Sequence, residues 1–198
     1  MHYYISPQIW AWKENRIRKI KRDIDHMYVI LPFEKAFYEE KHGMTVHFVG
    51  HPLIDALKDR PSPDPLKFRE ENGLDPEKPI IALLPGSRAQ EVRKMLPLML
   101  SCVSHFPGYQ FVVAGAPSLE PDFYAPYLKD GEARLVIDQT YALLQVAHAG
   151  LVTSGTATLE TALLGVPQVV CYKGNWVSYQ IAKRLITLEY ISLVNLIM

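Results

Sequence analysis

The sequence has little cysteine, no net charge and no long hydrophobic run. Its two cysteines, Cys102 and Cys171, lie in apolar surroundings, which predicts buried free thiols in a reducing compartment. The seven His residues show no metal-ligand spacing, so no metal site is expected. No apolar run approaches the roughly 20 residues of a membrane-spanning helix. No signal peptide is visible at the start of the chain.

The composition predicts a packed globular protein. Of the 198 residues, 48% are hydrophobic and 21% are charged, which excludes a disordered chain. Lys and Arg together number 21, as do Asp and Glu, so no overall attraction to nucleic acid is expected. The chain is long enough for one large or two small domains.

The basic residues are nevertheless unevenly distributed. One short segment contains Lys13, Arg16, Arg18, Lys19, Lys21 and Arg22. Trp10 and Trp12 come just before it, and tryptophans next to basic residues are typical of an anionic lipid surface. The alternative is that both tryptophans belong to the core and the charges only face water.

Short apolar segments alternate with helical patterns along the chain. Strands are expected at 2–6, 26–31, 45–49, 79–84, 110–114, 133–137, 149–153 and 168–172, and helices at 13–22, 33–41, 52–59 and 90–106. This alternation predicts an α/β protein with parallel sheets and right-handed crossovers. Three prolines within residues 61–65 indicate a boundary between two domains.

Polar clusters follow three of the expected strands. Gly86-Ser87-Arg88 follows strand 79–84, Ser154 follows strand 149–153, and Lys173 follows strand 168–172. Ligands of such sheets bind beyond the carboxyl ends of the strands. The three clusters therefore predict a binding site on one rim of the second sheet.

The most informative cluster is Ser154-Gly155-Thr156 with the helix that follows it. A tight turn into a helix directs N–H groups and the positive helix end at one point, as in phosphate sites. Glu160 lies about one turn further on, where a carboxylate suits the paired hydroxyls of a ribose. The alternative is an ordinary helix capped by Ser154 or Thr156, with Glu160 solvated.

Arg88 is the second strong candidate. Arginine can bind a diphosphate with two parallel hydrogen bonds and never loses its charge. Without an anion nearby, an arginine at a helix start is unfavourable against the helix dipole. The alternative is a surface side chain. Glu91 and Arg93, on the same expected helix, are expected to pair with each other.

Three further residues have no single interpretation. Asn195 ends an apolar run and, taken alone, is a capping or turn residue. Glu34 lines a cleft between the two domains or favours the start of its own helix. His51 is a hinge or cleft residue or belongs to a structural turn.

Taken together, the motifs resemble the lipid-A-disaccharide synthase family. They are Ser6-Pro7-Gln8-Ile9-Trp10-Ala11-Trp12-Lys13, Leu31-Pro32-Phe33-Glu34-Lys35-Ala36-Phe37-Tyr38, Gly50-His51-Pro52, Leu83-Leu84-Pro85-Gly86-Ser87-Arg88, Ser154-Gly155-Thr156-Ala157-Thr158-Leu159-Glu160 and Tyr190-Ile191-Ser192-Leu193-Val194-Asn195-Leu196. The resemblance runs from end to end in the family's order. It covers about the second half of the family without its extreme C-terminus, so a fragment is expected.

The resemblance implies two Rossmann-like parallel-sheet domains of the GT-B type, the first only partly present. Residues 1–58 would belong to the N-terminal domain, 59–65 would be the linker, and 66–198 would form the UDP-sugar domain. The implied enzyme is an inverting glycosyltransferase. It would join UDP-2,3-diacylglucosamine to 2,3-diacylglucosamine 1-phosphate through a β-1,6 bond, releasing UDP and lipid A disaccharide 1-phosphate.

The resemblance also assigns roles to the candidate residues. Substrate-binding residues would be Gly86, Ser87, Arg88, Ser154, Gly155, Thr156, Glu160 and Asn195. Arg88 would be catalytic, because it would neutralise charge on the departing UDP. No metal or other cofactor is implied. The general base would lie in the N-terminal half, so this chain alone is expected to be inactive.

The implied setting is the cytoplasm of a Gram-negative bacterium, peripheral at the inner membrane, and the implied assembly is a homodimer. Two other readings stay open. One is another GT-B-type UDP-GlcNAc enzyme, either a 2-epimerase or the peptidoglycan transferase, although the Trp10/Trp12 segment and the 192–195 run argue against both. The other is a non-catalytic nucleotide-binding or membrane-recruited module. An upstream glycine-rich loop and acidic residue would favour the enzyme.

Overall fold

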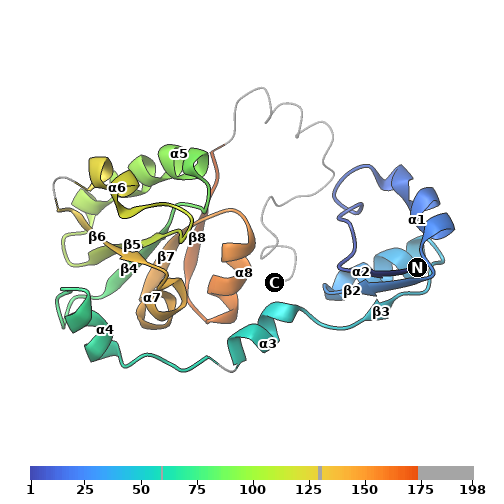
Figure 1. Cartoon of the computed structure of the whole chain (residues 1–198), viewed down its shortest axis with the longest axis horizontal. Helices are drawn as coiled ribbons and strands as arrows, with labels where there is room; N and C mark the ends of the chain where they lie inside the picture. The colour runs from blue at the N-terminus through green and yellow to red at the C-terminus, as the bar shows by residue number, and fades with distance from the viewer. Residues whose placement is uncertain (59, 129–130, 174–198) are drawn as a thin grey trace. The chain divides into compact units, whose positions relative to one another are not determined.

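The computed structural model describes residues 1–58, 60–128 and 131–173 (Figure 1). These residues separate into two compact units, Met1–Arg60 and Pro61–Lys173. Both units have a parallel sheet with helices, which confirms the predicted α/β class. The domain limits predicted from the sequence stay a prediction.

The first unit has a three-stranded sheet in the order β1-β2-β3. Its elements are β1 (His2–Tyr4), η1 (Glu14–Arg16), α1 (Ile17–Asp23), β2 (His26–Val29), α2 (Pro32–Ala36), η2 (Phe37–Lys41), β3 (His47–Phe48) and α3 (Pro52–Lys58). α1 buries Ile17 and Ile20 against Met27 and Val29, so its basic side chains face outward. Pro32 occupies the first turn of α2, where its missing N–H costs no hydrogen bond.

The second unit has a five-stranded sheet in the order β6-β5-β4-β7-β8. Its elements are α4 (Pro65–Glu71), β4 (Ile80–Leu84), α5 (Ala89–Leu100), η3 (Val103–His105), β5 (Gln110–Gly115), α6 (Pro121–Tyr124), η4 (Ala125–Tyr127), β6 (Ala133–Ile137), α7 (Thr140–Val146), β7 (Ala149–Thr153), α8 (Thr156–Leu163) and β8 (Gln168–Cys171). The strand order reverses at β4, because β5 and β6 lie on one side of it and β7 and β8 on the other. Such a switch point is where doubly wound sheets bind ligands.

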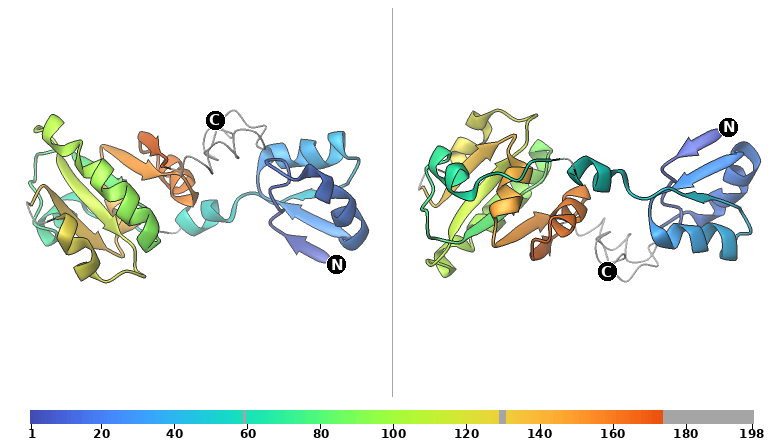
Figure 2. Two further views of the ribbon diagram at one scale, coloured as in Figure 1. Left: turned by 90° about the horizontal axis from the view of Figure 1, so that it is seen from above. Right: turned by 90° about the horizontal axis from the view of Figure 1, so that it is seen from below.

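Helices cover both faces of this sheet (Figure 1, Figure 2), and an apolar cluster lies on each face. On one face, α5 and α6 pack Leu96 and Tyr124 against Leu83 and Val113. On the other face, α4, α7 and α8 pack against Ala82 and neighbouring strand residues. Both faces of β4 are therefore buried, which explains its unbroken apolar sequence.

The structure differs from the sequence predictions for one helix, one strand and the two cysteines. The helix expected at 90–106 ends at Leu100, and Pro97 lies inside it. The strand expected at 45–49 is only His47–Phe48. Cys102 and Cys171 are free thiols, but they are half-buried rather than buried: Cys102 lies just beyond the end of α5, and Cys171 lies at the margin of the apolar cluster that α5 and α6 cover.

Candidate functional site

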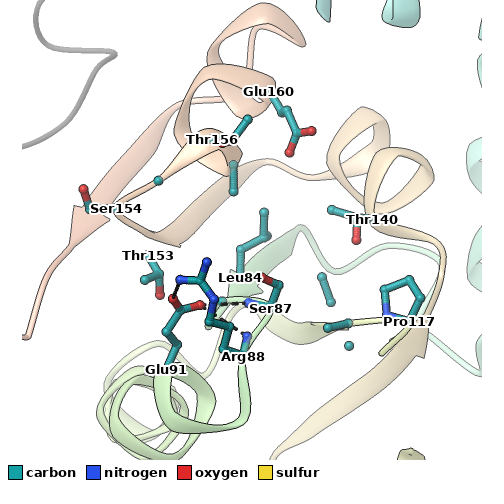
Figure 3. Close-up of a pocket in the computed structure, with 16 residues that line it drawn as sticks. Leu84, Ser87, Arg88, Glu91, Pro117, Thr140, Thr153, Ser154, Thr156 and Glu160 are labelled. Atoms are coloured by element: carbon teal, nitrogen blue, oxygen red, sulfur yellow. Dashed lines mark hydrogen bonds and ion pairs between the residues drawn. The ribbon is translucent and has the colours of Figure 1, made fainter. Parts of the chain in front are cut away.

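A pocket of about 410 Å³ opens at the carboxyl ends of β4, β5 and β7 (Figure 3). Its lining is Leu84, Gly86, Ser87, Arg88, Glu91, Ala114, Gly115, Ala116, Pro117, Thr140, Thr153, Ser154, Gly155, Thr156, Ala157 and Glu160. Segments more than 60 residues apart in the sequence thus meet at one edge of the sheet. The pocket includes every predicted site residue except Asn195, which lies outside the described residues. Lys173 follows β8 as expected but does not line the pocket.

The loop between β4 and α5 holds an anionic group of the protein itself. Glu91 Oε2 accepts hydrogen bonds from the N–H groups of Ser87 (3.1 Å) and Arg88 (3.3 Å). Glu91 Oε1 lies 3.1 Å from Arg88 Nη1. Glu91 therefore pairs with Arg88 and not with Arg93, which lies over the ring of Phe123. Residues two apart on a helix do not face each other, so the expected Glu91–Arg93 pair was wrong.

Gly86 gives this loop its shape. Its φ of +109° lies in a region that side chains rarely adopt, and a Cβ added there would lie 2.6 Å from Glu91 Oε2. Only glycine allows the Glu91 carboxylate to approach the loop this closely. The side chain of Arg88 remains 83% exposed and lies in the pocket lining, where it is accessible to a ligand.

The opposite side of the pocket is the start of α8. Its N-cap is Gly155, which has no side chain to cap the helix, so neither Ser154 nor Thr156 is the N-cap residue. The Ser154 N–H donates to the carbonyl of Cys171 (2.9 Å), which ties this turn to β8. The first N–H groups of a helix have no partner within the helix. Together with the helix dipole, they make an uncapped N-terminus suitable for an anion.

Glu160 lies on α8 at the same pocket, about one turn beyond this N-terminus. Its Oε1 accepts a hydrogen bond from the Tyr141 hydroxyl at 2.5 Å. Tyr141 belongs to α7, 19 residues earlier in the sequence. Sequence reasoning missed this pair, since no local pattern relates an aromatic residue on one helix to a carboxylate on the next.

Two other parts of the lining were also missed. One is the end of β5 with the two residues after it, Ala114, Gly115, Ala116 and Pro117, where small residues at a strand end indicate a close approach. Thr153, the last residue of β7, has a buried Oγ1 without a hydrogen-bond partner among the described residues. A buried polar atom without a partner costs free energy, so a polar ligand reaching it would be stabilised.

In the first unit, Glu34 is the centre of a buried network. The residue is only 2% exposed. Oε1 accepts from Ser6 Oγ (2.6 Å) and Trp10 Nε1 (3.1 Å), and Oε2 accepts from the N–H groups of Ile30 (3.1 Å) and Leu31 (2.9 Å). The helix-start interpretation of Glu34 is confirmed. Glu34 also joins the two motifs at 6–13 and 31–38, which the sequence did not indicate.

The two tryptophans differ in their surroundings. Trp10 is half-buried, bonded to Glu34 and packed edge-on against Phe33 with a ring-centroid distance of 4.9 Å. Trp12 is 48% exposed, and Lys13 Nζ lies 4.2 Å from its ring centroid. Only Trp12 therefore lies beside the exposed basic residues of 13–22.

His51 belongs to the turn before α3. Its Nδ1 accepts a hydrogen bond from the Leu53 N–H (3.2 Å). Burial lowers the pKa of this imidazole, and the charge of Glu34 partly opposes that shift. This hydrogen bond confirms that His51 belongs to a structural turn.

Within the described ranges, no three His, Cys, Asp or Glu side chains are grouped so that they could hold a metal ion. Over the same residues, none of the helices has the length and apolar content needed to cross a membrane.

Solved structures share the fold. A crystal structure of UDP-N-acetylglucosamine 2-epimerase matches 90% of this chain and 48% of its own, with a TM-score of 0.52 and 17% identity. At that identity the likeness shows the fold alone, and it agrees with the expected GT-B-type architecture.

Sequence comparison is more specific. The family model described as Lipid-A-disaccharide synthetase matches residues 1–198. The lipid-A-disaccharide synthases of Trichlorobacter lovleyi and Geobacter metallireducens are 43% and 41% identical over 98% of this chain. The chain spans 52% of the length of each, which is about half of these curated relatives. The chain therefore belongs to the lipid-A-disaccharide synthase family.

Proposed function

We propose that the pocket of the second unit binds the UDP part of UDP-2,3-diacylglucosamine. Arg88 and the N-terminus of α8 would bind the diphosphate from opposite sides. Glu160 would accept hydrogen bonds from the ribose hydroxyls, and the small residues at the end of β5 would leave room for the nucleotide. Asn195 is proposed for the same pocket because of the family resemblance.

The observation that best supports this proposal is the uncapped start of α8 opposite Arg88 in one pocket. A helix start without a cap leaves N–H groups in need of an acceptor. An exposed guanidinium in the same pocket adds a full positive charge. The combination favours a ligand with several anionic oxygens, and the Thr153 hydroxyl gives it one more polar contact.

In the intact protein, we propose transfer of the diacylglucosamine unit to the 6-hydroxyl of 2,3-diacylglucosamine 1-phosphate. The bond from the anomeric carbon to the UDP oxygen would break as the acceptor oxygen attacks from the opposite side. A general base would take the acceptor proton, and the resemblance assigns that base to the N-terminal half of the family. Turnover is therefore not expected from this chain alone.

Arg88 and the start of α8 would stabilise the negative charge that develops on the departing UDP. We propose that these groups do so without a metal ion. Undiminished UDP binding in the presence of EDTA would agree with this, whereas binding that requires added Mg²⁺ would contradict it.

Calorimetric titration of UDP into the chain tests the donor site. Binding should be weakened about 10- to 100-fold in Arg88→Ala, as expected when a charge-assisted hydrogen bond is removed. Glu160→Ala should also weaken it. Lys94→Ala, which removes an exposed cation on α5 outside the pocket, is the control and should bind UDP normally. No binding by a folded chain would contradict the proposal.

We further propose that the intact protein is cytoplasmic and contacts the inner membrane through Trp12 and the basic residues of 13–22. An enzyme with lipid substrates would meet them at the membrane surface. Vesicles containing anionic lipid should retain the wild-type chain better than a Trp12→Ala/Lys19→Glu variant, and neutral vesicles should retain neither. Equal retention of both proteins would contradict this surface assignment. A homodimer is proposed only from the family resemblance.

A further inference from the structure

The hydrogen bond between Tyr141 and Glu160 holds a pocket carboxylate in place before any ligand arrives. Tyr141 is half-buried on α7, and its hydroxyl donates to Glu160 Oε1 at 2.5 Å. A hydrogen bond from a hydroxyl to a carboxylate at this distance is of the strong, charge-assisted kind. Thr140, the residue before Tyr141, lines the same pocket, so the start of α7 lies beside Glu160 (Figure 3).

From this contact we infer that Tyr141 is a positioning residue that makes the pocket selective for nucleotides with ribose hydroxyls. The inference rests on the proposed nucleotide site. A free glutamate side chain has several rotatable bonds and loses much freedom when a ligand fixes it. Tyrosine has only two such bonds, so its hydroxyl is a rigid anchor. The cost of ordering Glu160 is then met during folding rather than during binding.

The acceptor capacity of the carboxylate is consistent with this role. An ionised carboxylate offers about four lone-pair directions on its two oxygens. One of these, on Oε1, is used by Tyr141. A vicinal pair of ribose hydroxyls needs two more, one on each oxygen or both on Oε2. Tyr141 therefore fixes the orientation of the carboxylate and leaves enough lone pairs for both ribose hydroxyls.

The competing explanation is that the pair only fastens α7 to α8. The two helices pack on the same face of the sheet, so a purely structural bond would be reasonable. The two roles differ in what they predict for ligands. A structural bond would affect all nucleotides alike, whereas a positioning bond affects only those that present hydroxyls to Glu160.

The test compares UDP with 2′,3′-dideoxyuridine diphosphate by calorimetry in wild type, Tyr141→Phe, Glu160→Ala and the double variant. Tyr141→Phe should weaken UDP binding roughly 3- to 10-fold, the usual effect of losing one hydrogen bond, and leave the dideoxy analogue nearly unchanged. In the Glu160→Ala background it should have little further effect. Tyr109→Phe, another half-buried tyrosine of this unit, is the matched control and should bind both nucleotides normally.

Equal weakening for both nucleotides, or additive effects in the double variant, would overturn the role of Tyr141 while leaving the nucleotide site intact. Failure of the folded wild type to bind UDP would overturn the site itself, and the inference with it. Thermal melting of each variant would show whether any loss of binding reflects a loss of folding.

Discussion

Glu91 holds Arg88 across the first turn of α5, with 3.1 Å between Oε1 and Nη1. Its other oxygen accepts from the N–H groups of Ser87 and Arg88. The carboxylate thus occupies donors next to the position proposed for the diphosphate. An arriving anion would attract Arg88 away from Glu91 and would be repelled by the Glu91 charge.

Glu91→Gln should therefore strengthen UDP binding. The amide keeps an acceptor oxygen for the loop but removes the repelling charge and the partner of Arg88. An increase of about 2- to 5-fold is expected, because exposed ion pairs are worth up to about 1 kcal/mol. Calorimetry at low and high salt measures the change, which should shrink at high salt. Weaker binding with an unchanged melting temperature would show that Glu91 assists the ligand instead.

Gly86→Ala should damage both the loop and the pocket. The added methyl group would require a strained φ and would collide with Glu91, so a loss of about 1–3 kcal/mol in unfolding free energy is expected. UDP affinity should fall with it. Denaturant unfolding and calorimetry measure the two effects.

The matched control for that change is Gly108→Ala. A Cβ added at Gly108 meets no atom within 4 Å. The unfolding free energy of Gly108→Ala should stay within about 0.5 kcal/mol of wild type, as is usual at surface positions. If the two variants lost the same stability, the proposed conflict with Glu91 would not be the cause.

Glu34→Gln should destabilise the first unit although it hardly changes the shape of the side chain. Each carboxylate oxygen accepts two hydrogen bonds, and the amide nitrogen that replaces one of them can only donate. Neither the Trp10 N–H nor the backbone N–H groups of Ile30 and Leu31 can reverse their roles. An unfolding free energy lower by about 1–3 kcal/mol is expected from the unsatisfied donors.

Guanidinium unfolding followed by tryptophan fluorescence measures this loss. Glu40→Gln removes the same charge from an exposed position on η2 and should have little effect. Similar midpoints for Glu34→Gln and wild type would mean that the network contributes nothing to stability.

The His51 imidazole should titrate below its ordinary pKa of 6.5, because burial disfavours its charged form. The unfolded chain then binds a proton more readily than the folded chain. This contribution to stability is present above pH 6.5 and is lost as the pH falls through the folded pKa. Protonation would also remove the acceptor used by Leu53.

NMR titration of the His51 ring measures the pKa directly. Unfolding free energies of wild type and His51→Asn from pH 7.5 to 5 provide the second measurement, since asparagine can still accept from Leu53. Wild type should lose stability relative to the variant as the pH falls. A pKa at or above 6.5 would contradict the assigned effect of burial.

The parallel α/β class and most strand positions could be predicted from the sequence, because short apolar segments and the turns between them are local features. The sequence also located Arg88, Ser154 and Glu160 on one rim, since the carboxyl ends of neighbouring parallel strands must meet. Gly86 and Gly155 belong to that same local information, because positive φ values at a strand-to-helix turn call for glycine.

Which side chains meet could not be predicted from the sequence and depends on how the chain folds in three dimensions. Tyr141 reaches Glu160 because the crossovers place α7 and α8 on the same face of the sheet, and Ser6 and Trp10 reach Glu34 across 28 and 24 residues of sequence. The hydrophobic periodicity of a sequence indicates which positions are buried, but it does not indicate which residues they contact. A hydrogen bond over such a separation depends on strand order and helix packing, which arise only when the whole unit folds.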